Sequence, residues 1–126
     1  MPANLESIGG YAFEGCTSLE QLSIPESCTQ IGEYAFENCT KLTKITSESK
    51  NKLVLYGYTF YGCIALEEVY LPNVGITAYN TTWYGRNFGG CKNLQKVQLG
   101  SKNNPLTELS VWAFNECSRN DLIIKI

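Results

Sequence analysis

A Phe-x-x-Cys pair returns five times along the chain of 126 residues, and no other feature constrains the fold as strongly. Successive pairs are 23, 24, 28 and 26 residues apart, and they start at Phe13, Phe36, Phe60, Phe88 and Phe114. In four of the five copies a leucine follows the cysteine three residues later. A period of about 20–29 residues is typical of arrays in which one structural unit stacks on the next. The spacing therefore predicts a single solenoid domain over residues 1–126.

Each repeat also contains two short apolar segments. After the leucine, apolar and polar residues alternate, as in Leu22 to Ile24, which predicts a short strand with one buried face. Before the phenylalanine lies a second apolar position, such as Ile8 or Ile31. We expect it on the other side of the coil, as a brief strand followed by a helical or 3₁₀ turn that carries Ala-Phe. Stacked coils would then pair the first strands in a parallel sheet on one face.

The order Ile-Gly-x-x-Ala-Phe-x-x-Cys-x-x-Leu-x-x-Ile-x-Ile-Pro-x-x-x-Thr-x-Ile resembles the BspA-like leucine-rich repeat, most closely over Leu5–Ile45. The resemblance implies an α/β-type leucine-rich-repeat solenoid of about four to five repeats, with mostly short parallel β-strands, turns and short helical or 3₁₀ segments. It also implies a secreted or cell-surface protein that takes part in adhesion or in binding host proteins. The third to fifth repeats are longer than this pattern, and Cys117 lacks the following leucine.

An even number of cysteines in a short exported chain suggests disulfide bonds, but their register argues otherwise. Five of the six share one slot in successive coils, where parallel side chains about 4.8 Å apart do not present the ~90° torsion of a disulfide. We expect a column of free, buried thiols at Cys16, Cys39, Cys63, Cys91 and Cys117. A linear column also lacks the converging ligands of a zinc site. We interpret Cys28, outside this register, as core filling.

The composition excludes several classes of function. The chain has no histidine, which removes Ser-His-Asp and Cys-His catalysis and the commonest metal ligand. Its formal net charge is −2 and it has no cluster of Lys or Arg, which argues against nucleic acid or an anionic membrane surface as a partner. No apolar stretch approaches the ~18 residues of a membrane span. We therefore expect no catalytic residue, no cofactor and no bound metal.

Binding residues are expected on the outer face of the predicted sheet, because solenoids present such faces to their partners. The outward positions form two columns of mixed chemical character. One column contains Ser23, Thr46, Tyr70, Gln98 and Lys125, and the other contains Gln21, Lys44, Glu68, Lys96 and Ile123. The candidate binding residues are seven of these ten, all except Gln21, Ile123 and Lys125. The alternative is a sheet face that is merely solvated.

An insertion over Thr77–Asn87 lengthens the third interval and carries Tyr79, Trp83, Tyr84 and Arg86. Insertions in repeat arrays often hold binding specificity, and Tyr, Trp and Arg are enriched at interface hot spots. The aromatic residues could equally fold back and cover the longer coil. Both interpretations remain open at this point.

Two functions fit these observations. The first is a non-catalytic binding or adhesion module of a cell-surface protein, with a host extracellular-matrix or surface protein as the ligand that the resemblance implies. The second is a structural spacer without a ligand of its own. The chain begins inside a repeat at Leu5–Ile8 and stops in a strand at Ile124–Ile126, from which we expect either a longer parent protein or end-to-end self-association.

Overall fold

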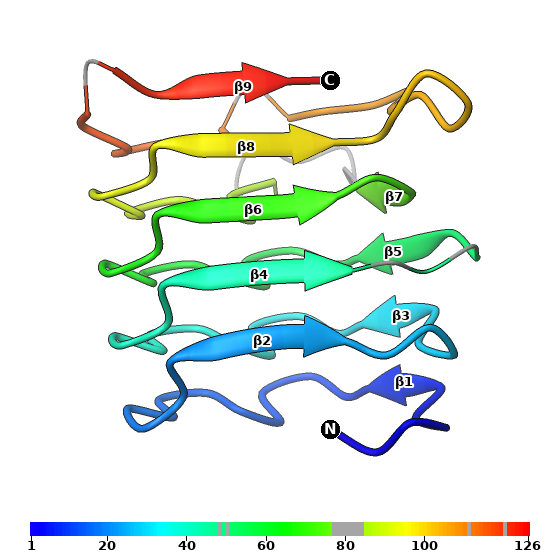
Figure 1. The fold of residues 1–126 in the computed structure, drawn as a ribbon. Helices are drawn as coiled ribbons and strands as arrows, with labels where there is room; N and C mark the ends of the chain where they lie inside the picture. The colour runs from blue at the N-terminus through cyan, green and yellow to red at the C-terminus, as the bar shows by residue number, and fades with distance from the viewer. Residues whose placement is uncertain (48, 50, 77–84, 111, 120) are drawn as a thin grey trace.

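The chain forms a stack of coils with a parallel sheet on each of two sides, as the computed structural model shows (Figure 1). The structure describes residues 1–47, 49, 51–76, 85–110, 112–119 and 121–126. One sheet contains β1 (Ser7–Ile8), β3 (Gln30–Ile31), β5 (Leu53–Leu55) and β7 (Val74–Ile76), in that order. The other contains β2 (Gln21–Ile24), β4 (Lys44–Ser47), β6 (Glu68–Leu71), β8 (Lys96–Leu99) and β9 (Ile123–Lys125). The predicted solenoid is confirmed.

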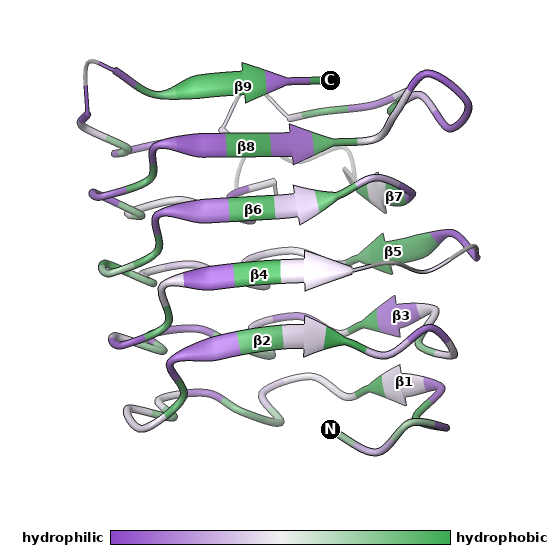
Figure 2. Cartoon of the chain, in the orientation of Figure 1, coloured by the Kyte–Doolittle hydropathy of each residue, from purple (hydrophilic) through white to green (hydrophobic). Residues whose placement is uncertain are grey.

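In the five-stranded sheet every second residue points into the core. Leu22, Ile45, Val69 and Val97 pair across neighbouring strands and are at most 3% exposed. Figure 2 shows their positions as a hydrophobic band that crosses the strands. Ile124 continues this register on β9 and is 38% exposed. Because side chains alternate along a strand, the residues on either side of this band face outward.

Five phenylalanine rings stack through the core, one from each Phe-x-x-Cys pair. Neighbouring ring centroids are 5.1–5.5 Å apart, and the ring planes lie within 13° of parallel. Phe36, Phe60 and Phe88 are fully buried, whereas Phe13 and Phe114 are partly buried. Each stacked pair contributes about 0.5–1.5 kcal/mol beyond its burial, so the column ties each coil to the next.

All six cysteines are free thiols, as predicted, and within the column Cys39, Cys63 and Cys91 are buried, whereas Cys16 and Cys117 in the outer coils are only partly buried. From the second coil onward, each in-register thiol donates a hydrogen bond to the carbonyl oxygen of the phenylalanine one coil earlier, over 3.1–3.4 Å. Cys28 is fully buried outside the column, and its thiol bonds to the carbonyl of Gln30 over 3.5 Å. Cysteine is small enough for the core and still supplies a weak donor, which suits this position.

The segment that carries each Phe-x-x-Cys pair is a series of turns, so the expected helical or 3₁₀ segment is wrong. Alternate amides bond three residues back within the coil, as from Cys16 to Phe13. The amides between them, on Tyr11, Phe13 and Gly15, donate to carbonyls of the second coil over 2.7–2.9 Å. Because every second amide leaves its coil, no continuous helix forms, and none occurs in the described residues. These bonds recur in later coils, and we call them the turn ladder.

The turn ladder places two residues of the first coil in the left-handed region of the backbone. The first position is a tyrosine in the first three coils, with φ of 58–61° at Tyr11, Tyr34 and Tyr58. The second is a glycine in three coils, at Gly15, Gly62 and Gly90, and is Asn38 or Glu116 in the other two. A side chain in this region costs roughly 1–2 kcal/mol. Stacking of the tyrosine rings, with centroids 4.9 and 4.7 Å apart, offsets part of that cost.

Candidate functional site

The outer face of the five-stranded sheet carries both predicted columns in register. The Cα partners in one column are Ser23, Thr46, Tyr70, Gln98 and Lys125. Those in the other are Gln21, Lys44, Glu68, Lys96 and Ile123. The parallel pairing of equivalent residues therefore aligns side chains that lie more than twenty residues apart in the sequence.

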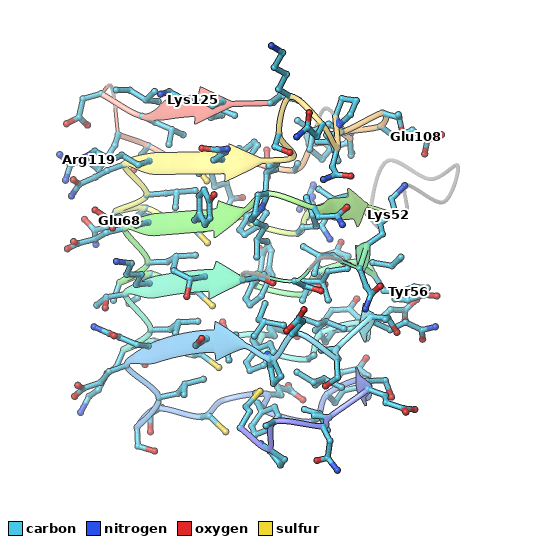
Figure 3. All side chains as sticks on the ribbon, turned by 45° about the vertical axis from the view of Figure 1, so that its right-hand side comes forward. Lys52, Tyr56, Glu68, Glu108, Arg119 and Lys125 are labelled. Atoms are coloured by element: carbon cyan, nitrogen blue, oxygen red, sulfur yellow. The ribbon has the colours of Figure 1, made fainter. Side chains whose placement is uncertain are left out.

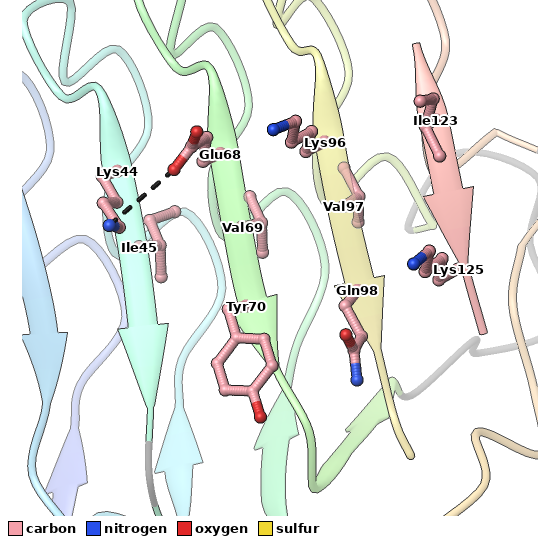
Figure 4. Close-up of a pocket in the computed structure, with 10 residues that line it drawn as sticks. All are labelled: Lys44, Ile45, Glu68, Val69, Tyr70, Lys96, Val97, Gln98, Ile123 and Lys125. Atoms are coloured by element: carbon pink, nitrogen blue, oxygen red, sulfur yellow. Dashed lines mark ion pairs between the residues drawn. The ribbon is translucent and has the colours of Figure 1, made fainter. Parts of the chain in front are cut away.

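A groove of about 390 Å³ lies on this face, over β4, β6, β8 and β9 (Figure 4). It collects five of the predicted binding residues and two further outward residues of β9. The lining residues are Lys44, Ile45, Glu68, Val69, Tyr70, Lys96, Val97, Gln98, Ile123 and Lys125. The three that are buried belong to the inward band, so the groove runs between the two outward columns.

The charged groups of the groove are three lysines and one glutamate. The Nζ atom of Lys44 lies 3.8 Å from Oε2 of Glu68, and both side chains are nearly half exposed. An ion pair of this kind is worth at most about 1 kcal/mol. Lys96 and Lys125 take part in none of the ion pairs between described residues. In Figure 4 the ammonium group of Lys96 extends toward Glu68, and that of Lys125 extends toward β8.

The groove also exposes apolar surface. Tyr70 is 44% exposed and Ile123 is 56% exposed, on strands that flank β8. Between them, the amide nitrogen Nε2 of Gln98 donates a hydrogen bond to the carbonyl of Gly100 over 3.3 Å. The arrangement can therefore accept a ligand with both apolar and charged groups, and it holds one of its polar side chains in place.

Ser23 and Thr46 lie outside this groove. They line a smaller adjoining hollow of about 170 Å³ together with Gln21, Leu22 and Lys44. Lys44 lines both hollows, so all seven predicted residues of the sheet face form one continuous surface.

A different hollow of about 290 Å³ lies at the four-stranded sheet, lined by Lys52, Val54, Gly75, Ile76, Thr107 and Glu108. Figure 3 shows Lys52 and Glu108 on the opposite side of the molecule from Glu68. This hollow contains none of the predicted binding residues.

The insertion is only partly described. Tyr79, Trp83 and Tyr84 lie outside the described residues. Arg86 is half-buried, and its guanidinium carbon lies 5.1 Å from the centroid of the Trp112 ring in the following coil. This cation–π contact joins two coils, and Arg86 does not line the groove.

Within the parts of the chain that the structure describes, no group of three or more His, Cys, Asp or Glu residues could hold a metal ion. The same parts contain no helix with the length and apolar character needed to cross a membrane.

The sequence did not single out Ile123 and Lys125 as binding candidates, although both lay in the predicted columns. Alternation in Leu122–Ile126 was the signal that placed them outward. Both residues line the same groove as Tyr70 and Gln98. The shape of this groove depends on the side-chain volumes on four strands, and the sequence pattern does not predict that shape.

Comparison with known proteins supports the repeat pattern. The family model "BspA type Leucine rich repeat region (6 copies)" matches residues 1–119. The fold is similar to the crystal structure of a T. pallidum leucine-rich repeat protein (TpLRR), with a TM-score of 0.69 and 24% sequence identity. That match covers 93% of this chain and 53% of the other, so the chain spans about half the length of that protein. None of the curated proteins matches.

Proposed function

Because the chain belongs to the BspA-type leucine-rich repeat family, we propose that it is a non-catalytic module that binds another protein through the outer face of its five-stranded sheet. Leucine-rich repeat domains generally bind proteins and are generally not enzymes. The observation that carries the proposal is the alignment of outward side chains around the groove on β4, β6, β8 and β9. Solenoid proteins use such extended faces for contact.

We also propose a location and a biological role for the chain. Proteins with repeats of this type are typically extracellular or attached to surfaces, which supports a secreted or cell-surface adhesion module with a host extracellular-matrix or surface protein as ligand. Tyr79, Trp83, Tyr84 and Arg86 of the insertion are proposed as a second contact region. The residue types support that role, whereas the contact between Arg86 and Trp112 favours a structural role for Arg86.

A structural spacer without a ligand of its own is the second candidate, and end-to-end association of the chain is proposed beside it. The support for association is the exposed apolar surface at β9, where Ile123 and Ile124 are 56% and 38% exposed, next to Ile126 at 63%. Light scattering tests the association, because end-to-end contacts between copies raise the apparent mass with concentration.

The test of the binding module is a pair of variants against immobilised extracellular-matrix proteins. Tyr70→Ala/Gln98→Ala alters the sheet face, and Gln30→Ala/Lys52→Ala is the matched control on the four-stranded side, where both residues are exposed. We expect the first to weaken binding in surface plasmon resonance and the second to leave it unchanged. Unchanged binding by both variants would place the contact outside the sheet face, and no binding of the wild type to any matrix protein would count for the spacer.

A further inference from the structure

The groove on the five-stranded sheet differs in charge from the rest of the molecule. It is lined by three of the ten basic residues and by one of the twelve acidic residues of the chain. The chain as a whole has a formal net charge of −2, so this face is basic on an acidic protein. This difference in charge attracts anionic groups to the groove and repels them from the rest of the protein surface.

From this contrast we propose that the groove binds an extended acidic segment of the partner protein, an inference that rests on the proposed binding function. The carboxylates of the segment lie against Lys96 and Lys125, whose side chains form no ion pair with described residues. The remaining lysine of the groove, Lys44, is already paired with Glu68 at 3.8 Å. Two cationic positions are therefore left to recognise the ligand.

The apolar part of the groove indicates which ligand side chains lie next to the carboxylates of the acidic segment. The Tyr70 ring and the Ile123 side chain are both exposed, and one strand separates them. An apolar or aromatic side chain of the ligand packs between them, and burial of such a side chain provides affinity that charge alone does not. The segment therefore alternates acidic and apolar residues.

The dimensions agree with a short extended segment. The groove crosses β4, β6, β8 and β9, and three intervals of about 4.8 Å give a length of roughly 14 Å. About four residues of extended chain, at ~3.3 Å each, span that distance. A sulfated polysaccharide fits less well, because it needs a longer row of cations and has no group for the exposed Ile123.

The test selects ligands without assuming their sequence. A phage library of random short peptides is selected on the immobilised chain, and the selected peptides are synthesised with a fluorescent label. Their Kd values are measured by anisotropy for the wild type, for Lys96→Glu/Lys125→Glu and for Tyr70→Ala. The matched control is Lys41→Glu/Lys92→Glu, which makes the same change of charge at two exposed lysines outside the groove. Circular dichroism checks that each variant folds, and heparin serves as the polysaccharide probe.

We expect selected peptides with net negative charge, at least about tenfold weaker binding to Lys96→Glu/Lys125→Glu, and little change for the control. Equal loss in the control variant overturns the groove as the acidic site. Neutral or basic peptides that lose affinity with Tyr70→Ala overturn the acidic segment but leave the sheet face as the contact surface. Heparin that competes at the groove without any acidic peptide being selected overturns the peptide in favour of a polysaccharide. Peptides insensitive to every sheet substitution, or no selected peptide, overturn the proposed function as well.

Discussion

The thiol of Cys63 donates a hydrogen bond to the carbonyl oxygen of Phe36, 3.2 Å away in the preceding coil. The two residues are 27 positions apart, and each belongs to a different copy of the Phe-x-x-Cys pair. Each Phe-x-x-Cys pair therefore connects its coil to the neighbouring coils. The phenylalanine ring stacks on the rings of those coils, and the thiol donates to the backbone carbonyl of the preceding phenylalanine.

Cys63→Ala should lower the free energy of unfolding by about 1–2 kcal/mol, because a fully buried sulfur and its hydrogen bond are lost. Cys16→Ala is the matched control. Cys16 has the same slot in the first coil but is only partly buried, and its thiol donates to no carbonyl of a described residue. Urea denaturation of both variants measures the difference. Equal losses would show that the bond between coils contributes nothing.

The stability of the fold should fall at alkaline pH through Cys117. Burial raises the pKa of this thiol from 9.0 to about 11. Because the folded state holds the proton more tightly than the unfolded state, the contribution is fully present below pH 9 and is lost as the pH rises toward 11. Urea midpoints from pH 8 to pH 11 test this, and the decline should be shallower in Cys117→Ala than in the wild type. Identical slopes would remove Cys117 as a cause.

Glu116→Gly should stabilise the protein by up to about 1 kcal/mol, because Glu116 has φ of 62° and a side chain in this region is strained. Glycine already occupies the equivalent position at Gly15, Gly62 and Gly90. Gly62→Ala is the opposite experiment, since a Cβ there would overlap the side-chain oxygen of Asn38. Thermal unfolding should place the two variants on opposite sides of the wild type, and a destabilised Glu116→Gly contradicts the account.

Glu68→Gln should tighten binding of acidic peptides by up to about fivefold, because it removes the negative charge of the groove and releases Lys44. The fold should lose less than about 1 kcal/mol of stability, as expected for an exposed ion pair. Anisotropy titrations at low and high salt measure the effect, which screening should reduce. Unchanged affinity at low salt would mean that the ligand does not approach Glu68.

The sequence predicted the sheet face well because two periods act together. The alternation in a strand decides which side Lys44 or Tyr70 faces, and the repeat length decides which residues of the next coil stand beside them. The free thiols followed from the same register.

The turn ladder could not be predicted from these two periods. Its residues with left-handed backbone conformation include tyrosines, although this conformation favours glycine and asparagine. Half of its amides donate to carbonyls of another coil. Ala-Phe therefore suggested a helical turn where the backbone alternates between bonds inside and outside the coil. The contact of Arg86 with Trp112 could not be predicted either, because a longer third interval shows that residues were added but not what they pack against.

The turn ladder also gives the stack a direction. Amides of each coil donate to carbonyls of the coil that follows, from Phe13 to Ala35 and from Phe88 to Ala113. Any repeat thus presents acceptors to its predecessor and donors to its successor, whatever its place in the array. An in-frame duplication of one repeat therefore supplies a coil whose turn-ladder donors and acceptors match those of the coils on either side. Arrays of this kind can therefore change length in evolution by unequal recombination while the residues on their outer face diverge independently.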